Sequence, residues 1–296
     1  MNIESNGKSR IKGNVFCTTL QMEWKKAVKA LCLVVISLRL WIPTVLADDT
    51  TSPTNSAPPA EQAQPSPHAN ESPDVPAIRL DKEGQPMKAF LAAHDSFLKR
   101  GKSGQIGLLF IGDSITAAWP YWGKAVWKKY YGAYNAADFG FGGDRTQNVL
   151  WRIDNGELDG ISPAVVVLLI GTNNHSATDV GLVPAIKKIV DEIHGKLPNT
   201  KVLLLGIFPR GNDPQNPPGN ARIRAAIINV NKALAAFDDG KKTRFLDIGS
   251  KFLDPSGAIS KNIMADGLHP TAAGYQIWAD AMQPLLDEML KDGNPQ

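Results

Sequence analysis

Apolar residues along this chain follow two alternating patterns. In the first, a short uninterrupted apolar run stops at glycine or a polar residue, which is typical of a buried parallel strand. In the second, apolar residues recur every three or four positions, which is typical of an amphipathic helix. Strands are predicted at Gln105–Ile111, Tyr134–Phe139, Ala164–Ile170, Lys201–Phe208 and Thr243–Ile248, and the strong ones follow the first pattern. The second predicts helices at Pro86–Arg100, Gly123–Tyr131, Thr146–Ile153, Val180–Leu197, Arg222–Phe237 and Thr271–Leu290.

The alternation of strands and helices predicts the fold class. Continuous apolar strands separated by helices favour an α/β fold, a three-layer α/β/α sandwich with a five-stranded parallel sheet. In such sheets the ligand binds at the carboxyl ends of the strands. Gly112, Gly140–Gly143 and Gly171 each follow a predicted strand, so we expect them to meet at that edge.

The first 47 residues have the pattern of an export signal. Three lysines between positions 25 and 29 precede an apolar run, and Val45-Leu46-Ala47 has small residues where signal peptidase reads them. We therefore expect a signal peptide over residues 1–47, cleaved before Asp48, with Met22 as an alternative start. The other interpretation is an uncleaved anchor from Ala30 to Ala47, although Arg39 and a proline interrupt that stretch.

A linker and one folded domain are expected after the leader. Residues 48–77 are rich in Pro, Ser, Ala and Gln and have few large apolar residues, so they predict a disordered linker, and residues 78–296 form the domain. Seven of the 32 Lys and Arg residues and two of the 29 Asp and Glu residues lie in the leader, which leaves 25 basic and 27 acidic residues. The net charge of −2 argues against a nucleic-acid partner. Both cysteines, Cys17 and Cys32, lie in the leader, so the remainder has no disulfide.

Candidate catalytic residues lie at the two ends of the domain. Ser114 follows the first strand in Gly112-Asp113-Ser114, where a hydroxyl is a plausible nucleophile beside a helix N-terminus. A nucleophilic serine needs a base and a carboxylate that orients this base. Asp266 and His269 have a spacing that allows both roles. The alternative is structural, with Asp113 or Ser114 capping the next helix and Asp266 capping the last helix beside a surface histidine.

Further candidates follow other strands. An acyl-transfer site needs donors to the oxyanion, and Gly143 and Ser114 offer backbone N–H groups while Asn173 offers a side-chain amide. The structural alternatives are a tight turn at Gly143 and a loop cap at Asn173. Asp113 and His175 are candidate substrate contacts because of their positions after strands.

The sequence does not match the motifs of several other classes of binding site and enzyme. Arg145 stands where a dinucleotide-binding fingerprint requires its third glycine, and no phosphate-binding Gly-Lys-Ser/Thr follows a strand. Ser114 is not part of a G-x-S-x-G elbow, and no pair of histidines has the spacing of a zinc site. We therefore expect no metal or organic cofactor.

The ordered blocks Gly112-Asp113-Ser114, Gly143, Asn173 and Asp266-x-x-His269 resemble those of the GDSL, or SGNH, hydrolases. The resemblance covers roughly Gln105 to Leu290. Within the family, the chain looks most like the catalytic-subunit-like esterases of platelet-activating factor acetylhydrolase, on the basis of five stretches: Phe139–Asp144, Val149–Arg152, Gly156–Leu158, Gly171–His175 and Phe208–Gly211.

The resemblance implies a flavodoxin-like sandwich with Ser114 as the nucleophile, His269 as the base and Asp266 as its orienting carboxylate. It also implies Ser114, Gly143 and Asn173 as oxyanion donors. Two positions depart from the family. Asn174 stands where the broader family often has Asp, and Asp138 stands where the acetylhydrolase branch has Asn.

The function expected from these features is an exported serine esterase, secreted or periplasmic, that removes short acyl groups through an acyl-enzyme. The acetyl preference comes from the resemblance, and an acetylated polysaccharide is the favoured substrate for an exported enzyme. Trp119, Trp122 and Trp151 are candidates for a sugar platform, and core packing is the alternative.

Two other functions are left open by the sequence. One is a lysophospholipase or thioesterase that acts on longer acyl chains. The other is a non-catalytic carbohydrate-binding or surface protein. We expect no stable membrane insertion after cleavage, and a homodimer is an option by analogy that no feature of the sequence decides.

Overall fold

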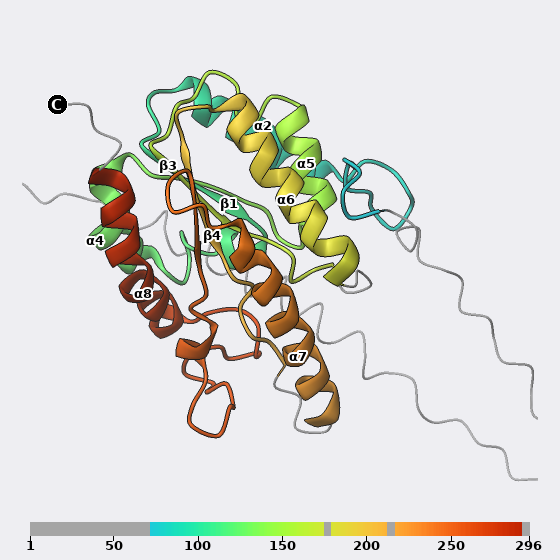
Figure 1. The fold of residues 1–296 in the computed structure, drawn as a ribbon. Coiled ribbons are helices and arrows are strands. Elements are labelled where there is room, and N and C mark those ends of the chain that lie inside the picture. The colour runs from blue at the N-terminus through green and yellow to red at the C-terminus, as the bar shows by residue number, and fades with distance from the viewer. Residues whose placement is uncertain (1–71, 175–178, 212–216, 292–296) are drawn as a thin grey trace, which may run out of the picture. The chain divides into compact units, whose positions relative to one another are not determined.

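The computed structural model describes residues 72–174, 179–211 and 217–291 (Figure 1). All the described residues belong to one unit, which lies within Ala63–Gln296. The predicted leader and most of the predicted linker lie outside the described residues. Within the described ranges, no helix has both the length and the apolar character needed to cross a bilayer.

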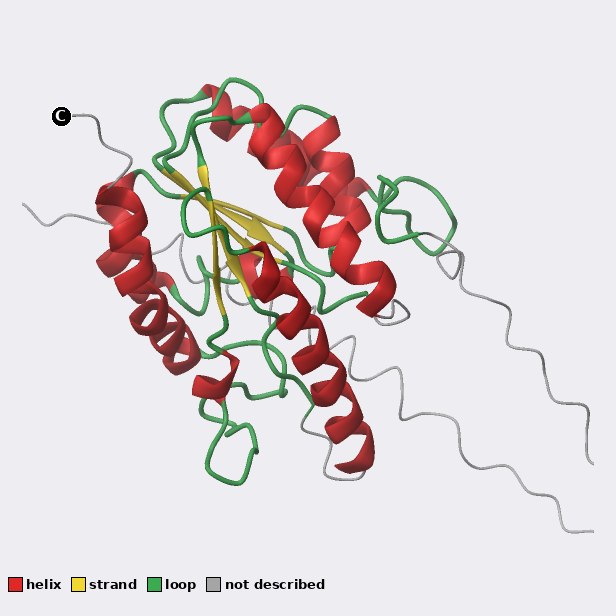
Figure 2. Cartoon of the chain, in the orientation of Figure 1, coloured by secondary structure: helices red, strands yellow, loops and turns green. Residues whose placement is uncertain are grey.

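A five-stranded sheet forms the centre of the domain, and every neighbouring pair of strands is parallel (Figure 2). The strand order is β2-β1-β3-β4-β5. The strands are β1 (Leu108–Gly112), β2 (Ala137–Gly140), β3 (Val165–Leu169), β4 (Lys201–Leu205) and β5 (Thr243–Leu246). The predicted fold class is therefore confirmed, with each strand inside or overlapping its predicted range.

Helices cover both faces of the sheet (Figure 1). One layer contains α2 (Lys88–Lys102), α5 (Thr146–Asp154), α6 (Asp179–Lys196) and α7 (Pro217–Leu234). The other contains α3 (Ser114–Ala117), α4 (Lys124–Tyr131) and α8 (Ala272–Lys291). Short 3₁₀ turns are η1 (Gly132–Tyr134), η2 (Ala235–Phe237) and η3 (Gly249–Phe252). Helix α7 begins at Pro217, five residues before the predicted start, because proline is well suited to the first turn of a helix.

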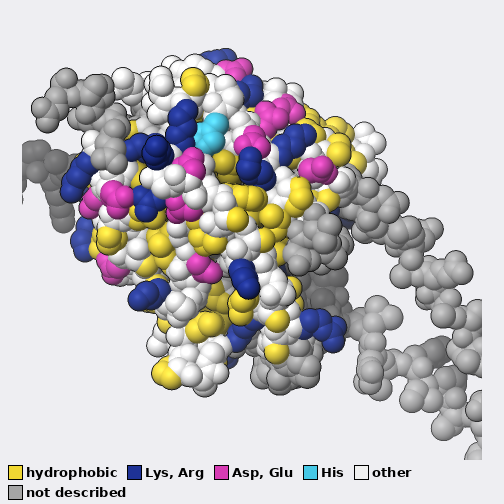
Figure 3. Space-filling view, viewed as in Figure 1, with side chains coloured by type: hydrophobic (Ala, Val, Ile, Leu, Met, Phe, Trp, Pro, Cys, Tyr) yellow, Lys and Arg dark blue, Asp and Glu magenta, His cyan; other side chains and the backbone are white. Residues whose placement is uncertain are grey.

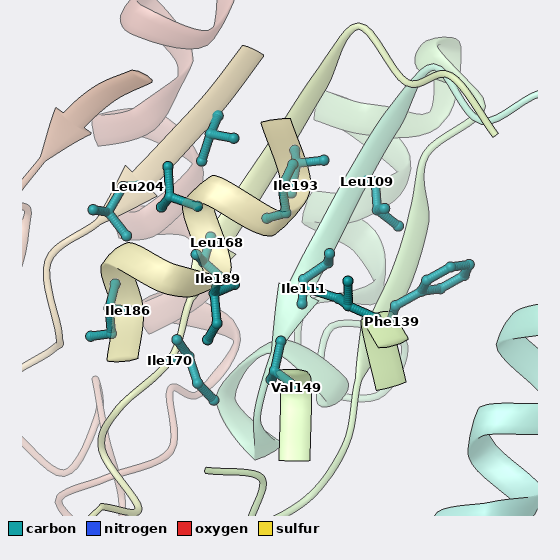
Figure 4. Close-up of a cluster of buried hydrophobic side chains, with 14 of the residues drawn as sticks. Leu109, Ile111, Phe139, Val149, Leu168, Ile170, Ile186, Ile189, Ile193 and Leu204 are labelled. Atoms are coloured by element: carbon teal, nitrogen blue, oxygen red, sulfur yellow. The ribbon is translucent and has the colours of Figure 1, made fainter. Parts of the chain in front are cut away.

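Two hydrophobic cores explain why the central strands β1 and β3 are uninterrupted apolar runs. Successive side chains of a strand point to opposite faces, and both faces of this sheet are covered. Leu109 and Ile111 pack toward α5 and α6 with Phe139 and Ile189, as Figure 4 shows. The alternate residues of β1 pack instead toward α4 and α8. Each fully buried side chain of this kind contributes about 1.5–3 kcal/mol.

The segment before α2 is attached to the domain. The Ala77 N–H donates to the Gln147 carbonyl (3.0 Å), and the Thr146 hydroxyl donates to the Pro73 carbonyl (2.7 Å). Residues 72–77 belong to the predicted linker, yet these bonds hold part of that stretch against α5. Figure 3 shows basic and acidic side chains interspersed over the face in view, in keeping with the small net charge expected after the leader.

The strand order determines where a ligand can bind. The chain leaves β1 toward the layer of α3 and α4, whereas it leaves β3 toward the layer of α6. Connections that diverge to opposite faces from neighbouring strands open a crevice at the carboxyl edge. The ends of β1, β2 and β3 lie side by side at this edge, because Gly112 pairs with Gly140 on one side and Leu169 on the other.

Candidate active site

Ser114 is the first residue of α3 and lies two residues after Gly112, where β1 ends. Only glycine fits at position 112, because an added Cβ would lie 2.2 Å from the Thr116 hydroxyl and 2.4 Å from the Leu169 carbonyl oxygen. This close approach lets the chain turn sharply from the strand into the helix. Ser114 is half-buried at the carboxyl edge of the sheet.

The structure brings Ser114, His269 and Asp266 together although 155 residues separate the serine from the histidine. The Ser114 hydroxyl oxygen lies 2.9 Å from His269 Nε2. On the other side of the ring, His269 Nδ1 lies 2.6 Å from Asp266 Oδ2. A neutral imidazole can therefore donate its Nδ1 proton to the carboxylate and accept the serine proton at Nε2.

A compact turn before α8 holds the acid and the base. Asp266 Oδ1 accepts hydrogen bonds from the backbone N–H groups of Leu268 (3.0 Å) and His269 (2.8 Å), so the other carboxylate oxygen is free for the ring. Gly267 adopts φ 72°, a conformation that favours glycine. Its carbonyl accepts from the Gly211 N–H (3.0 Å), which connects this turn to the loop after β4.

Opposing effects act on the Asp266 carboxyl group. Its partial burial raises the pKa, but the hydrogen bonds from His269 and Leu268 outweigh burial and hold the pKa below its ordinary value. The carboxylate is therefore ionised at neutral pH. The Asp266 side chain is 56% exposed, so solvent screens its attraction to the imidazole.

The three candidate oxyanion donors lie around the same edge. Gly143 is the third residue of a β-turn that the Asp144 N–H closes by donating to the Phe141 carbonyl (3.1 Å), and its φ of 78° requires glycine. The Phe141 N–H donates to the Gly112 carbonyl (3.1 Å), which places this turn beside the serine. The Asn173 amide donates to the Asp144 carbonyl (2.9 Å), so Asn173 lies against the same turn.

The loop after β3 is fixed by its own neighbours. Arg210 donates to the Thr172 carbonyl (2.8 Å), directly before Asn173. Asn174 is buried, and its amide nitrogen donates to the Thr146 hydroxyl (3.0 Å) and to Gln147 Oε1 (3.1 Å). An aspartate carboxylate could not make these two donations, which explains why this chain accommodates Asn at the position where the broader family often has Asp.

Asp138, the other departure from the family, lies in β2 with one carboxyl oxygen accepting from the Gly140 N–H (2.9 Å). The other oxygen is buried and has no hydrogen-bond partner among the described residues. Burial raises the pKa of Asp138 to about 8, although the Gly140 N–H and the nearby Arg152 oppose this effect. The carboxyl group is therefore mostly neutral at pH 7.

Asp113 does not have the predicted role of a substrate contact. Its side chain is 1% exposed and caps α3 by accepting from the Ile115 N–H (2.9 Å), so it cannot reach a substrate and the capping interpretation describes it. Burial raises the pKa of Asp113 to about 7, opposed by the Ile115 N–H and by Arg210. His175, the other predicted contact, lies outside the described residues.

A buried ion cluster was not predicted from the sequence. It lies next to the β-turn Phe141–Asp144, called the oxyanion turn below. Arg152 is fully buried between two carboxylates, with Nε 3.0 Å from Asp144 Oδ2 and its terminal nitrogen bonded to Glu157. His94 lies beside Glu157, 3.8 Å away, and contacts the Asn155 carbonyl (3.2 Å). This cluster anchors Asp144, the residue that follows Gly143.

The three tryptophans considered for sugar binding lie in different environments. Trp119 is fully buried and packs on Tyr275 with ring centroids 4.4 Å apart, so it is a core residue. Trp151 packs on Phe90 of α2. Trp122 alone among the three is largely exposed, with 62% of its surface accessible.

The arrangement contains the parts that nucleophilic acyl transfer requires: a hydroxyl bonded to an imidazole, a carboxylate that orients the imidazole, and nearby N–H donors for an oxyanion. Within the described ranges, His, Cys, Asp and Glu side chains form no group of three or more that could hold a metal ion.

Comparison with known proteins agrees with this chemistry. Residues 110–277 match the GDSL-like lipase/acylhydrolase family. The chain is 34% identical over 219 residues to platelet-activating factor acetylhydrolase IB subunit alpha2 from Rattus norvegicus, covering 74% of this chain and 91% of that protein. It is 35% identical over 202 residues to the alpha1 subunit from Bos taurus, covering 68% of this chain and 84% of that protein.

Solved structures share the fold. A GDSL-like lipase from Bacteroides thetaiotaomicron superimposes with a TM-score of 0.55 and 20% identity, covering 67% of this chain and 98% of that one. The sequence matches extend over most of the described domain and include the segments that carry the serine and the histidine. The chain belongs to the GDSL-like lipase/acylhydrolase family and is an esterase of the GDSL type.

Proposed function

We propose that the protein is an exported serine esterase that removes short acyl groups, acetyl above all, through an acyl-enzyme intermediate. The observation that carries this proposal is the continuous chain of hydrogen bonds from Ser114 through His269 to Asp266 at the carboxyl edge of the sheet.

The residues have defined roles in the reaction. Ser114 Oγ attacks the ester carbonyl carbon while His269 Nε2 takes the serine proton. The tetrahedral oxyanion accepts hydrogen bonds from the backbone N–H groups of Ser114 and Gly143 and from the Asn173 amide. The intermediate collapses as the C–O bond to the alcohol breaks, and His269 returns the proton to the leaving alcohol. Water then attacks the acyl-enzyme by the same sequence and releases the acid and free Ser114.

The relatives support the proposed acyl specificity. Two of them are named as subunits of an acetylhydrolase, which favours a two-carbon acyl group in this enzyme as well. The leader over residues 1–47 favours export and cleavage before Asp48. Together with the exposed Trp122, export favours an acetylated polysaccharide outside the cytoplasm as the source of the ester.

The test uses enzyme purified after expression of the full-length chain. Wild type, Ser114→Ala and the control Ser96→Ala are assayed on p-nitrophenyl acetate, butyrate and octanoate and on acetylated xylan. Ser96 is a fair control because it is exposed on α2 and its hydroxyl bonds only the Ala93 carbonyl among the described residues. We expect wild type and Ser96→Ala to hydrolyse p-nitrophenyl acetate and to deacetylate acetylated xylan, and Ser114→Ala to do neither.

The chain-length profile separates the alternatives. A preference for octanoate would replace the deacetylase with a lysophospholipase or thioesterase. Wild type as inert as Ser114→Ala on every substrate would favour a non-catalytic carbohydrate-binding protein. Intact mass and N-terminal sequence of the exported protein test the leader, and a start at a residue other than Asp48 would contradict the proposed cleavage site.

A further inference from the structure

Arg79 lies against the oxyanion turn although it is 64 residues before Gly143 and precedes the segment that matches the family. Its guanidinium donates to the Gly142 carbonyl with a distance of 2.5 Å. A Cβ added at Gly143 would lie 2.5 Å from one guanidinium nitrogen and 2.7 Å from the other. The guanidinium group therefore occupies the space beside Gly143 that a side chain would need.

The carbonyl that Arg79 binds belongs to the peptide unit that supplies the proposed oxyanion donor. The Gly142 C=O and the Gly143 N–H are the two ends of one planar amide and point in opposite directions. A positive φ at the third residue of the turn, as at Gly143, marks a type II turn, and a type I turn differs from it by a flip of this central peptide. A hydrogen bond to the Gly142 carbonyl selects one of the two orientations of this peptide and so determines where the Gly143 N–H points.

The hydrogen bond from Arg79 to the Gly142 carbonyl also makes the Gly143 N–H a stronger donor. A hydrogen bond from a cation to a peptide carbonyl polarises the amide, and the N–H becomes a better donor. Burial of Arg79 is incomplete, since 25% of its side chain is exposed, and the buried Asp144 carboxylate lies 3.9 Å away. Burial lowers the pKa of Arg79, and the attraction of the Asp144 side chain opposes this effect, so the guanidinium stays charged at the turn.

The backbone around Arg79 is held in place. The Arg79 carbonyl accepts from the Met87 N–H (2.8 Å), which closes a short hairpin just before α2. Ala77, two residues earlier, is bonded on both its N–H and its carbonyl side to α5. The side chain then lies over the Phe141 ring, with 5.7 Å between the guanidinium carbon and the ring centroid. These contacts make Arg79 a fixed support for the turn rather than a surface cation.

We propose that Arg79 is a positioning residue of the oxyanion hole, which orients and polarises the Gly142–Gly143 peptide for the tetrahedral intermediate. The inference rests on the proposed function, because it assumes that the Gly143 N–H binds the oxyanion during acyl transfer. It predicts a specific kinetic signature, since both acylation and deacylation pass through an oxyanion at the same donors.

The experiment compares wild type, Arg79→Ala and Arg79→Met on p-nitrophenyl acetate. Loss of polarisation alone should lower kcat about 5-fold, and a peptide that also turns away should lower it about 100-fold. KM should change less than about 2-fold, because both chemical steps slow together. Phenylboronic acid, whose boron takes Ser114 Oγ to form a tetrahedral adduct while the proton moves to His269, should inhibit more weakly by a factor similar to the fall in kcat.

Arg100→Ala is the matched control. Arg100 also donates to backbone carbonyls, those of Gly104, Gln105 and Asn135, but far from the carboxyl edge of the sheet. This variant should keep the wild-type kcat and boronate inhibition. Arg79→Met keeps an apolar stem over Phe141 without a donor, and it takes the place of Arg79→Ala should that variant fail to fold.

The outcomes are distinct. Wild-type kcat and boronate inhibition in a folded Arg79→Met enzyme would overturn the inference and leave the proposed function intact. A fall in thermal stability with unchanged kcat would show a merely structural role and would overturn it as well. If the wild type has no activity that depends on Ser114, the proposed function is overturned and the inference fails with it.

Discussion

The raised pKa of the buried Asp138 carboxyl group can be tested quantitatively through the pH dependence of stability. Asp138 pairs in register with Phe110, so its side chain enters the layer that contains α3 and α8. One of its oxygens is buried without a partner among the described residues, and burial raises the pKa to about 8. Asp138→Asn places in this site the neutral residue of the acetylhydrolase branch, which can still accept from the Gly140 N–H.

The magnitude follows from proton linkage. The carboxyl group of the unfolded chain releases its proton near its ordinary pKa of 3.8, whereas that of the folded chain keeps its proton until about pH 8. Between these values the folded state binds more protons, so raising the pH destabilises the wild type, and Asn at this position removes that dependence. One pKa unit corresponds to about 1.4 kcal/mol, so the stability of Asp138→Asn relative to wild type should grow by about 3–4 kcal/mol from pH 5 to pH 8.

Urea unfolding of both proteins at pH 5, 6, 7 and 8 measures this difference. The other buried carboxyl groups with raised pKa values, such as those of Asp113 and Asp144, are present in both proteins and cancel in the difference. Asp95→Asn, an exposed substitution on α2 with the same change in charge, should keep a constant difference from wild type within about 0.5 kcal/mol. A constant difference for Asp138→Asn as well would refute the reasoning, because it would mean that this carboxyl ionises normally in the fold.

Three other substitutions test the site. Asp266→Asn should lower kcat about 10³- to 10⁴-fold because the imidazole loses its orienting acceptor, and an unchanged pH–rate profile with full activity would contradict this role. Asn173→Ala should lower kcat about 10²- to 10³-fold with KM within about 2-fold of wild type, and steady-state kinetics would expose a pure KM effect as a binding role instead. Arg152→Met should cost about 3–5 kcal/mol in urea unfolding, because it leaves the Asp144 and Glu157 carboxyl groups buried without their cation; a loss below about 1 kcal/mol would indicate that they are already neutral.

The sheet could be predicted because its signal is local. The central strands β1 and β3 are apolar runs that end at or near a glycine, and a run such as Val165–Leu169 is buried on both faces, so no long-range information is needed to recognise it. The gathering of Ser114, Gly143 and Asn173 at one edge follows from the parallel direction of the strands. The pairing of Ser114 with His269 was inferred from residue types in order along the chain, and only the structure gives their 2.9 Å separation.

The charged interior could not be predicted in the same way. Arg152 lies on a helix whose sequence pattern is amphipathic, and nothing local indicates that its guanidinium is fully buried. Asp113 was expected to contact the substrate because of its position after a strand, yet its side chain turns inward to cap α3. Whether a polar side chain faces solvent or protein depends on which distant elements cover it, and a single sequence does not contain this information.

The contacts that hold the site in place share one feature. It explains why the reactive groups could be predicted from the sequence and the residues that position them could not. The motif residues supply the reactive groups, but a side chain from a distant part of the chain binds the backbone beside three of them, Ser114, Gly143 and Asn173. Arg79 binds the Gly142 carbonyl before Gly143, Arg210 binds the Thr172 carbonyl before Asn173, and the Tyr275 hydroxyl binds the Ile115 carbonyl after Ser114 (2.6 Å). A catalytic group must be held to within a fraction of an ångström, and the strand ends alone leave these peptides free to turn. The chemistry is therefore encoded in short local motifs, whereas its precision depends on residues that only the folded chain brings to them.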